Sequence, residues 1–408
     1  MKNKISILLS SSKKFRNTGM FSVDLAAYDF FSRNFPEAEI KFYVFELGER
    51  KYYSQYESLL PYITYNEISK DNISDIAKSD LIVFWSDFFH NRSFLEEYME
   101  DYHFSKCKSS AEREDKQTLF HRAFFLEGEA PSVIRKSVIF GNSLMPSARK
   151  DFEVKDRYTK NFLTLYENAF AVMPRDEVSN VNARAFSGAH SIRGIDPAFL
   201  YQGAPRYKKK RILGLFLGRR TEISVSNVFS IMRFAKKEEL KIEWLPWMIN
   251  TESMIVRAVF NPRQMKNLFL HCLLSFVFKS DKEYSKSNLL NLSRHSVIIT
   301  DTYHLCINAM SQGVHVYGVG SNSTIYGKKA KDLHDKKKEV LFRMLGRSNR
   351  YFDVSDISCD KMQENYKERT VKDEMIDKSN ASKVDSSADI LKNVCENILK
   401  RSNKRGQS

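Results

Sequence analysis

Short apolar runs alternate with amphipathic segments along the whole chain. Residues 296–300 are largely β-branched, as in a strand buried within a parallel sheet. From Tyr303 the apolar residues recur at helical spacing, and Gly313 stands where a left-handed helix stop is expected. The stretch 293–314, followed by an apolar run, therefore predicts a strand–helix–strand unit. By the same pattern, strands are expected at 5–10, 40–45, 80–85, 133–140, 169–173, 211–217, 241–245, 296–300 and 314–319, with helices at 73–79, 152–166, 225–235 and 265–278.

This alternation holds in both halves of the chain. It predicts the α/β class, with two Rossmann-like doubly wound domains facing a cleft. A polar stretch with Gly and Pro at 201–210 is typical of a linker between them. The expected organisation is an N-terminal domain at 1–200, the linker at 201–210, a C-terminal domain at 211–358, a loose charged segment at 359–385, a helix at 386–402 and a disordered tail at 403–408.

The chain is basic, with 65 Lys and Arg against 50 Asp and Glu and a net charge of +15 over 408 residues. Such an excess favours anionic partners, with a solvated lysine-rich surface as the equal alternative. No zinc-finger, RRM or KH pattern is present, so nucleic acid is not an expected partner. A hydrophobic content of 42% and a mean hydropathy of −0.45 are typical of a soluble globular protein. No apolar run reaches the roughly 20 residues of a membrane span, and the apolar start is expected to form a strand, not a signal peptide.

Five cysteines are widely spaced and odd in number. They form no CxxC pair and no Cys/His spacing typical of zinc, so no metal site is predicted. Their use favours a reducing, cytoplasmic location. The basic charge is also compatible with a position at the inner face of the membrane.

His304 lies in the first turn of the helix that follows the strand at 296–300. Ligands of open parallel sheets bind beyond the carboxyl ends of the strands. A helix N-terminus at that edge attracts anions through free N–H groups and its positive dipole end. There an imidazole can exchange a proton with an anionic substrate. The alternative is that His304 only packs or caps, and Asp301 or Thr302 is expected to cap this helix.

Several polar residues could bind an anion at the same edge of the second domain. Arg219 and Arg220 follow a Gly at the end of the strand at 211–217, which suits a phosphate, although a basic surface turn is as good an interpretation. Ser323 lies in a Gly- and Ser-rich turn, and Lys328 follows it, so both could complete an anion cradle. For most lysines at 328–338, a solvated basic helix is the simpler expectation.

The run S-V-I-I-T-D-T-Y-H-L-C-I-N-A-M-S-Q-G-V, from Ser296 to Val314, resembles the late signature of the polysaccharide pyruvyltransferase family. That signature is a hydrophobic strand, Ser/Thr-Asp/Ser-Arg-Leu-His, a small-residue helix and Gly. His304 and Asp301 match their family positions. Thr302 stands where the family has an Arg that is expected to hold an anionic group of the donor. Either another cation holds this group here, or the activity differs.

Further matches occur in the same order along roughly residues 1–350. Arg175 opens a segment that is similar to the family turn Arg-Asp/Glu-x-x-Ser. Asn17 and Gly19 resemble the family's opening Asn-x-Gly, and Gly141 begins a segment like its Gly-x-Gly/Ser-x-x-Pro. The resemblance implies that Arg175 grips a carboxylate or phosphate; a local pair with Asp176 or Glu177 is the equal alternative.

The resemblance implies a GT-B-like fold and an enzyme of exopolysaccharide or capsule biosynthesis. Such an enzyme transfers a pyruvyl group from phosphoenolpyruvate to a sugar of a cell-surface glycan or its lipid-linked precursor, as a ketal and without a cofactor. His304 would then be the general acid/base. Two alternatives remain open: a GT-B glycosyltransferase that uses a nucleotide-activated sugar, and a non-catalytic basic binding protein.

Overall fold

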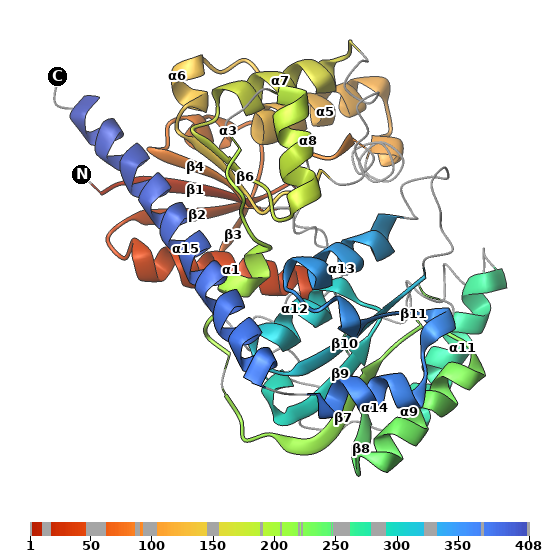
Figure 1. Cartoon of the computed structure of the whole chain (residues 1–408). Coiled ribbons are helices and arrows are strands. Elements are labelled where there is room, and N and C mark those ends of the chain that lie inside the picture. The colour runs from red at the N-terminus through yellow and green to blue at the C-terminus, as the bar shows by residue number, and fades with distance from the viewer. Residues whose placement is uncertain are drawn as a thin grey trace. The chain divides into compact units, whose positions relative to one another are not determined.

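A computed structural model of the chain shows two compact units (Figure 1). Unit 1 comprises Met1–Lys14, Val23–Tyr201 and Lys383–Ser408, and unit 2 comprises Phe15–Ser22 and Gln202–Ser382. The structure describes residues 2–9, 18–45, 63–85, 90–92, 104–144, 155–187, 191–204, 206–218, 221, 223–245, 247, 262–278, 291–321, 333–368 and 371–405.

The sheet of unit 1 is parallel throughout, in the order β3-β2-β1-β4-β5-β6. Its order reverses between β1 and β4, as in a Rossmann sheet. The central strands are largely apolar and are buried along nearly their whole length, because helices cover both faces. The strands are β1 (Lys4–Leu9), β2 (Glu39–Val44), β3 (Tyr65–Glu67), β4 (Leu81–Trp85), β5 (Ser137–Phe140) and β6 (Ala171–Met173).

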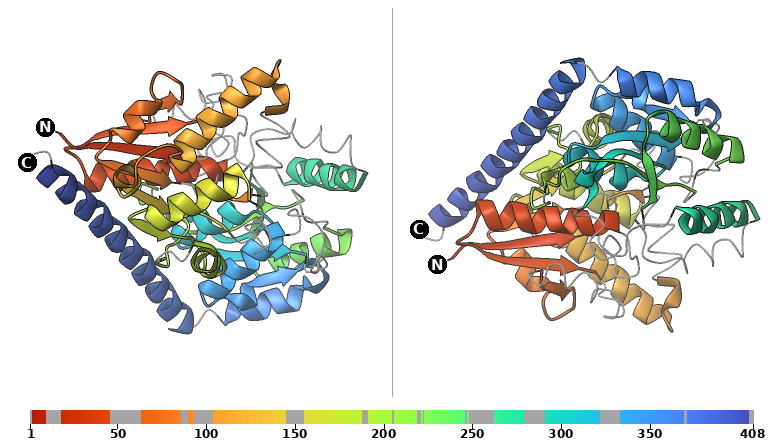
Figure 2. Two further views of the ribbon diagram at one scale, coloured as in Figure 1. Left: turned by 90° about the horizontal axis from the view of Figure 1, so that it is seen from above. Right: turned by 90° about the horizontal axis from the view of Figure 1, so that it is seen from below.

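Helices lie on both faces of this sheet. Figures 1 and 2 show α1 on one face and α5 and α7 on the other. The core beneath α5 and α7 is rich in aromatic rings, among them Phe84, Phe120, Phe124 and Phe162. The helices of unit 1 are α1 (Thr18–Asn34) from Val23 on, α3 (Ile73–Ala77), α5 (Ser110–Phe125), α6 (Pro131–Ile134), α7 (Arg157–Asn168) and α8 (Glu177–Ser187), with 3-10 turns η3 (Phe104–Lys106) and η5 (Pro197–Leu200).

Unit 2 has its own parallel sheet, in the order β11-β10-β9-β7-β8. When the strands of this unit are numbered in chain order, the sheet has the strand order of flavodoxin. The strand order reverses between β7 and β9. Parallel sheets of this kind bind ligands beyond the carboxyl ends of the strands at that reversal. The strands are β7 (Lys210–Phe216), β8 (Lys241–Trp244), β9 (His295–Thr300), β10 (His315–Gly320) and β11 (Tyr351–Asp353).

The predicted unit around residues 293–314 is present as β9, α12 and β10. Gly313 has a φ of +72°, as expected at a left-handed helix stop. The helices of unit 2 are α9 (Val225–Lys237), α11 (Pro262–Val277), α12 (Tyr303–Ser311), α13 (Leu333–Met344) and α14 (Cys359–Lys367), with 3-10 turns η7 (Leu292–Arg294), η9 (Ser348–Arg350) and η10 (Val354–Asp356). Helix α15 (Val371–Arg405) begins in unit 2, and from Lys383 on it belongs to unit 1.

The two predicted Rossmann-like α/β domains are confirmed; that they face a cleft stays a prediction. The expected N-terminal boundary is wrong in one respect. The first turn of α1, within Phe15–Ser22, groups with unit 2 because it packs on α12. The three-residue edge strands β3 and β11 were not predicted, since so short a strand carries too few positions for a period to show.

The expectation of a loose segment at 359–385 is also wrong. Residues 359–367 form α14, and α15 begins at Val371 instead of 386 and continues to Arg405, into the expected disordered tail. The C-terminal half of α15 is held by buried Leu391, Cys395 and Ile398. Since adding turns to an existing helix is far easier than starting one, this packed half supports the charged half. None of the helices among the described residues is long and apolar enough to cross a membrane.

Candidate functional site

The carboxyl ends of β7 and β9 meet at the reversal of the unit 2 sheet, and Asp301 joins them. Its N–H donates to the Phe216 carbonyl over 3.4 Å, and its Oδ2 accepts from the Thr221 N–H over 3.3 Å. Asp301 is buried. These bonds fix the two strand ends against each other, which is a structural role at the site.

Two buried hydroxyls flank Asp301. Thr302 is the N-cap residue of α12, but its side chain makes no cap hydrogen bond. Thr302 Oγ1 and Thr221 Oγ1 are both buried and have no hydrogen-bond partner among the residues that the structure describes. A hydroxyl can donate to an anion, and the first turn of a helix adds N–H groups that lack partners within the helix. This corner of the sheet therefore has the donors that an anion needs.

His304 lies in the first turn of α12, directly against α1. A Cβ added to Gly19 would lie 2.6 Å from His304 Cβ and 2.8 Å from its Nδ1, so only glycine permits this approach. His304 is 9% exposed, which leaves the imidazole nearly but not fully enclosed. Its ring also meets that of Tyr303 edge to face, with centroids 5.3 Å apart. The position of the imidazole is thus set by packing on three sides: its own helix, Gly19 and Tyr303.

Hydrogen bonds fasten the first turn of α1 to unit 2. Asn308 Nδ2 donates both to Ser22 Oγ, over 2.8 Å, and to the His304 carbonyl, over 2.7 Å. Thr18 Oγ1 donates to the Trp247 carbonyl over 2.6 Å. All these groups are buried. They hold Gly19 in place beside the imidazole.

Lys338 is a buried cation that the sequence interpretation missed. Its Nζ donates to the Asp301 carbonyl over 2.8 Å and to the Val319 carbonyl over 2.5 Å. It is 2% exposed, and Lys337 is 5% exposed, so the expected solvated basic helix is wrong for these two lysines. Helical spacing could have indicated that Lys338 is buried, because it precedes the buried Leu341 and Phe342 by three and four residues and so lies on the same side of the helix.

Cys306 is the thiol nearest to this site in the sequence. Burial raises the pKa of the Cys306 thiol to about 12, although the positive charge of Lys338 acts to lower this pKa. A thiol that stays protonated at neutral pH is a poor nucleophile. The candidate proton-transfer group at this corner is therefore His304. Among the described residues, no cluster of His, Cys, Asp and Glu could hold a metal ion.

Arg175 lies in unit 1, between two carboxylates. Its Nη1 donates to Asp196 Oδ2 over 3.1 Å, and its Nε lies 3.8 Å from Asp176 Oδ2. All three residues are buried. Two negative charges outweigh the guanidinium, so the described contacts do not favour a further anion here. Arg175 therefore pairs locally with Asp176, as the alternative interpretation expected, and it pairs with Asp196 as well.

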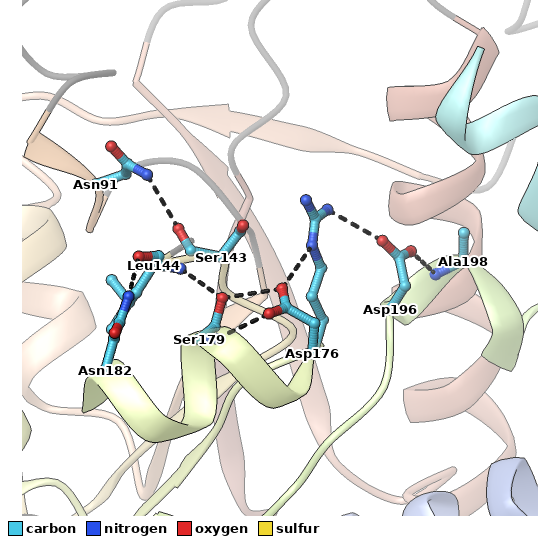
Figure 3. A network of polar contacts seen from close by, with 9 residues as sticks. Asn91, Ser143, Leu144, Asp176, Ser179, Asn182, Asp196 and Ala198 are labelled. Atoms are coloured by element: carbon cyan, nitrogen blue, oxygen red, sulfur yellow. Dashed lines mark hydrogen bonds and ion pairs between the residues drawn. The ribbon is translucent and has the colours of Figure 1, made fainter. Parts of the chain in front are cut away.

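The residues around Arg175 form a network that ties the loops after β5 and β6 together (Figure 3). Ser179 is its centre, since it donates to Asp176 and its Oγ accepts from the Leu144 N–H over 2.8 Å. Gly141, at the end of β5, has a φ of +74°, and a Cβ there would lie 2.1 Å from Pro197 Cγ. Gly141 is thus required for close packing of these loops.

Of the predicted site residues, the structure brings Gly19, Asp301, Thr302 and His304 together in unit 2, and it places Gly141 and Arg175 in unit 1. The remaining predicted site residues lie outside the described part of the chain: Asn17, Arg219, Arg220, Ser323 and Lys328.

Comparison with known proteins gives one family match. The family described as polysaccharide pyruvyl transferase matches residues 25–323, which include Asp301, Thr302 and His304. No curated protein matches the chain. Among solved structures, Arabidopsis thaliana UGT89C1 complexed with quercetin is 10% identical and covers 97% of this chain and 100% of its own, with a TM-score of 0.45. The E. coli heptosyltransferase WaaC with ADP-2-deoxy-2-fluoro heptose is 9% identical and covers 90% of this chain and 100% of its own, with a TM-score of 0.38.

Proposed function

The chain belongs to the polysaccharide pyruvyl transferase family, and from this premise we propose that it transfers a pyruvyl group from phosphoenolpyruvate to a sugar of a cell-surface glycan or its precursor. The observation that carries the proposal is the corner of unit 2 where an imidazole, two buried hydroxyls and an ammonium lie at the reversal of the sheet. Phosphoenolpyruvate brings a carboxylate, a phosphate and an enol carbon to be protonated. The corner offers groups suited to each.

His304 is assigned the proton transfers. It protonates the methylene carbon of phosphoenolpyruvate, which leaves an oxocarbenium-like centre at the adjacent carbon. A sugar hydroxyl adds there and returns a proton to the imidazole. Phosphate then leaves, and a second hydroxyl of the same sugar adds with loss of its proton, which gives the ketal. The sum is phosphoenolpyruvate plus a diol giving ketal plus phosphate.

The anionic groups of the donor are assigned to the corner itself. The family Arg is replaced by Thr302, and Lys338 is the cation that the described residues place beside it. Lys338 contacts the Asp301 carbonyl, one residue before Thr302, so its charge is close to the first turn of α12. An ammonium and oriented donors stabilise the charge of the leaving phosphate. Arg175 is not needed for this assignment.

The test is phosphate release from phosphoenolpyruvate with a panel of nitrophenyl hexosides as acceptors. The native protein should release phosphate only when an acceptor is present. His304→Ala should lose about 100-fold or more in turnover, the typical effect of a general acid/base, while keeping its melting temperature. Near-native turnover by a folded His304→Ala variant would remove His304 from the mechanism.

One observation favours a second candidate, a glycosyltransferase that uses a nucleotide-activated sugar. The family Arg at the donor position is absent, and Thr302 stands there. Melting curves with added ligands separate the two candidates. Stabilisation by phosphoenolpyruvate supports the pyruvyl transfer, and stabilisation by CMP-sialic acid or another sugar nucleotide alone supports the alternative.

A further inference from the structure

Helix α11 carries an apolar stripe that faces away from the core of unit 2. Phe269 and Phe276 are each 72% exposed, and Leu273 and Val277 are 45% and 56% exposed. These positions are spaced by four, three and one residues, so they share one side of the helix. Leu274, on another side, is buried. Contiguous exposed apolar surface of this kind marks an interaction site.

Helix α9 carries a second exposed stripe. Val225, Phe229 and Met232 lie at helical spacing and are exposed, while Ile231 and Phe234 face the core. Both helices belong to the β8 edge of the sheet. Helix α9 leads directly into β8, and the residue after α11, Phe278, accepts a hydrogen bond from the N–H of Trp244 in β8 over 2.7 Å.

Helix α9 is basic, because it contains Arg233, Lys236 and Lys237 but no Asp or Glu. Lys237 pairs with the exposed Asp360. Arg233 and Lys236 are exposed beside the apolar stripe of α9. Apolar residues flanked by Lys and Arg on a helix surface are typical of helices that lie in the interface of an anionic bilayer.

We propose that α9 and α11 dock the protein on an anionic lipid bilayer, with their exposed apolar stripes among the acyl chains and Arg233 and Lys236 at the headgroups. A second copy is a poorer occupant of this surface. In a two-fold dimer the same patch meets itself, so basic residues would face basic residues. This inference stands apart from the proposed chemistry, since no residue of the site is part of the surface.

Sedimentation with vesicles tests the proposal at physiological salt. The native chain should pellet with phosphatidylcholine vesicles that contain about 30% phosphatidylglycerol and should remain in solution with pure phosphatidylcholine. Replacing both phenylalanines by Phe269→Ser and Phe276→Ser should weaken the binding at least about tenfold. Arg233→Gln combined with Lys236→Gln should weaken it by a similar factor, and only on the anionic vesicles.

Met375→Ser is the matched control, because Met375 is 66% exposed on α15, away from both helices in the sequence. It should bind like the native chain, and all variants should keep the native melting temperature, since the changed side chains are exposed. No pelleting with anionic vesicles, or equal pelleting by the native chain and the double phenylalanine variant, would overturn the proposal. So would a native dimer that the phenylalanine changes convert to a monomer without lipid, because the face would then be a contact between copies.

Discussion

Gly19→Ala adds a single methyl group beside the candidate acid/base. The new Cβ would lie 2.6 Å from His304 Cβ, 2.8 Å from Nδ1 and 2.9 Å from Cγ. Carbon atoms in contact are about 3.5–4.0 Å apart, so the two residues must separate by about 1 Å. Rotation of the imidazole cannot relieve the contact with His304 Cβ, because that atom is fixed to the α12 backbone. The change therefore moves α12 relative to the first turn of α1.

The effects on stability and on turnover should differ. Alanine is favoured over glycine within a helix by about 1 kcal/mol, while overpacking costs about 1–3 kcal/mol, so the free energy of unfolding should fall by no more than about 2 kcal/mol. A displacement of about 1 Å at a catalytic group can reduce the rate about 100-fold. We therefore expect a large loss of kcat in a protein that remains folded.

The assay is the initial rate of phosphate release from phosphoenolpyruvate, measured beside urea unfolding of the same preparation. Gly214→Ala is the control. A Cβ there would lie 2.8 Å from Leu245 Cδ1 and 3.0 Å from Ile298 Cγ1, so it overpacks the sheet of unit 2 without touching His304. Its turnover per folded molecule should be near native. Native kcat in Gly19→Ala would refute the reasoning that packing on Gly19 sets the catalytic position of the imidazole.

Three further changes have distinct outcomes. Lys338→Met removes a buried ammonium that donates to two carbonyls. We expect the free energy of unfolding to fall by about 2–3 kcal/mol and the KM for phosphoenolpyruvate to rise more than about tenfold. A native KM would exclude Lys338 from donor binding. Burial lowers the pKa of His90 from 6.5 to about 4. The unfolded chain then binds more protons between these pH values, and the contribution of His90 to stability should fall by about 3 kcal/mol as the pH drops through that window. His90→Phe should reduce this slope in urea unfolding, and an unchanged slope would contradict the assignment. Arg175→Met leaves Asp176 and Asp196 buried without their cation, so the melting temperature should drop by the equivalent of about 3–5 kcal/mol; loss of turnover in the molecules that stay folded would instead indicate a catalytic role.

The centre of unit 2 was predictable from sequence for a physical reason. A strand buried on both faces is typically a nearly continuous apolar or β-branched run, and a helix that packs on it repeats its apolar residues at helical spacing. The strand β9, the helix α12 and the glycine stop at Gly313 each satisfy one of these rules. They therefore also located His304 in the first turn of α12.

What sequence could not predict depends on contacts between distant residues. Arg175 was expected to meet an anionic ligand or an adjacent acid; it does lie beside the adjacent Asp176, but it also donates a hydrogen bond to Asp196, 21 residues away. Nothing in local spacing indicates such a pair. Lys338 was misjudged because a lysine at a buried helical position is rare, and its hydrogen bonds to the carbonyls of Asp301 and Val319 help to make it acceptable there.

Helix α15 shows the same limit. Its first turns are charged and aperiodic, so the sequence indicated no element. In the structure Asp377 pairs with Arg347, and Asn380 Nδ2 donates to the Leu345 carbonyl over 3.0 Å. These contacts hold the charged half on unit 2, and the packed C-terminal half continues the same helix. Anchoring at two separated points, not an apolar period, makes this segment helical.

The central claim is that His304 protonates phosphoenolpyruvate at the unit 2 site. Its most direct test is the reaction run in deuterated water, with phosphorus NMR of the donor and mass spectrometry of the sugar product. We predict that the native protein converts phosphoenolpyruvate to phosphate and to an equimolar pyruvyl ketal whose methyl group carries a solvent deuteron, and that folded His304→Ala does neither. Unchanged phosphoenolpyruvate with the native protein, while a sugar nucleotide is consumed, would contradict the account.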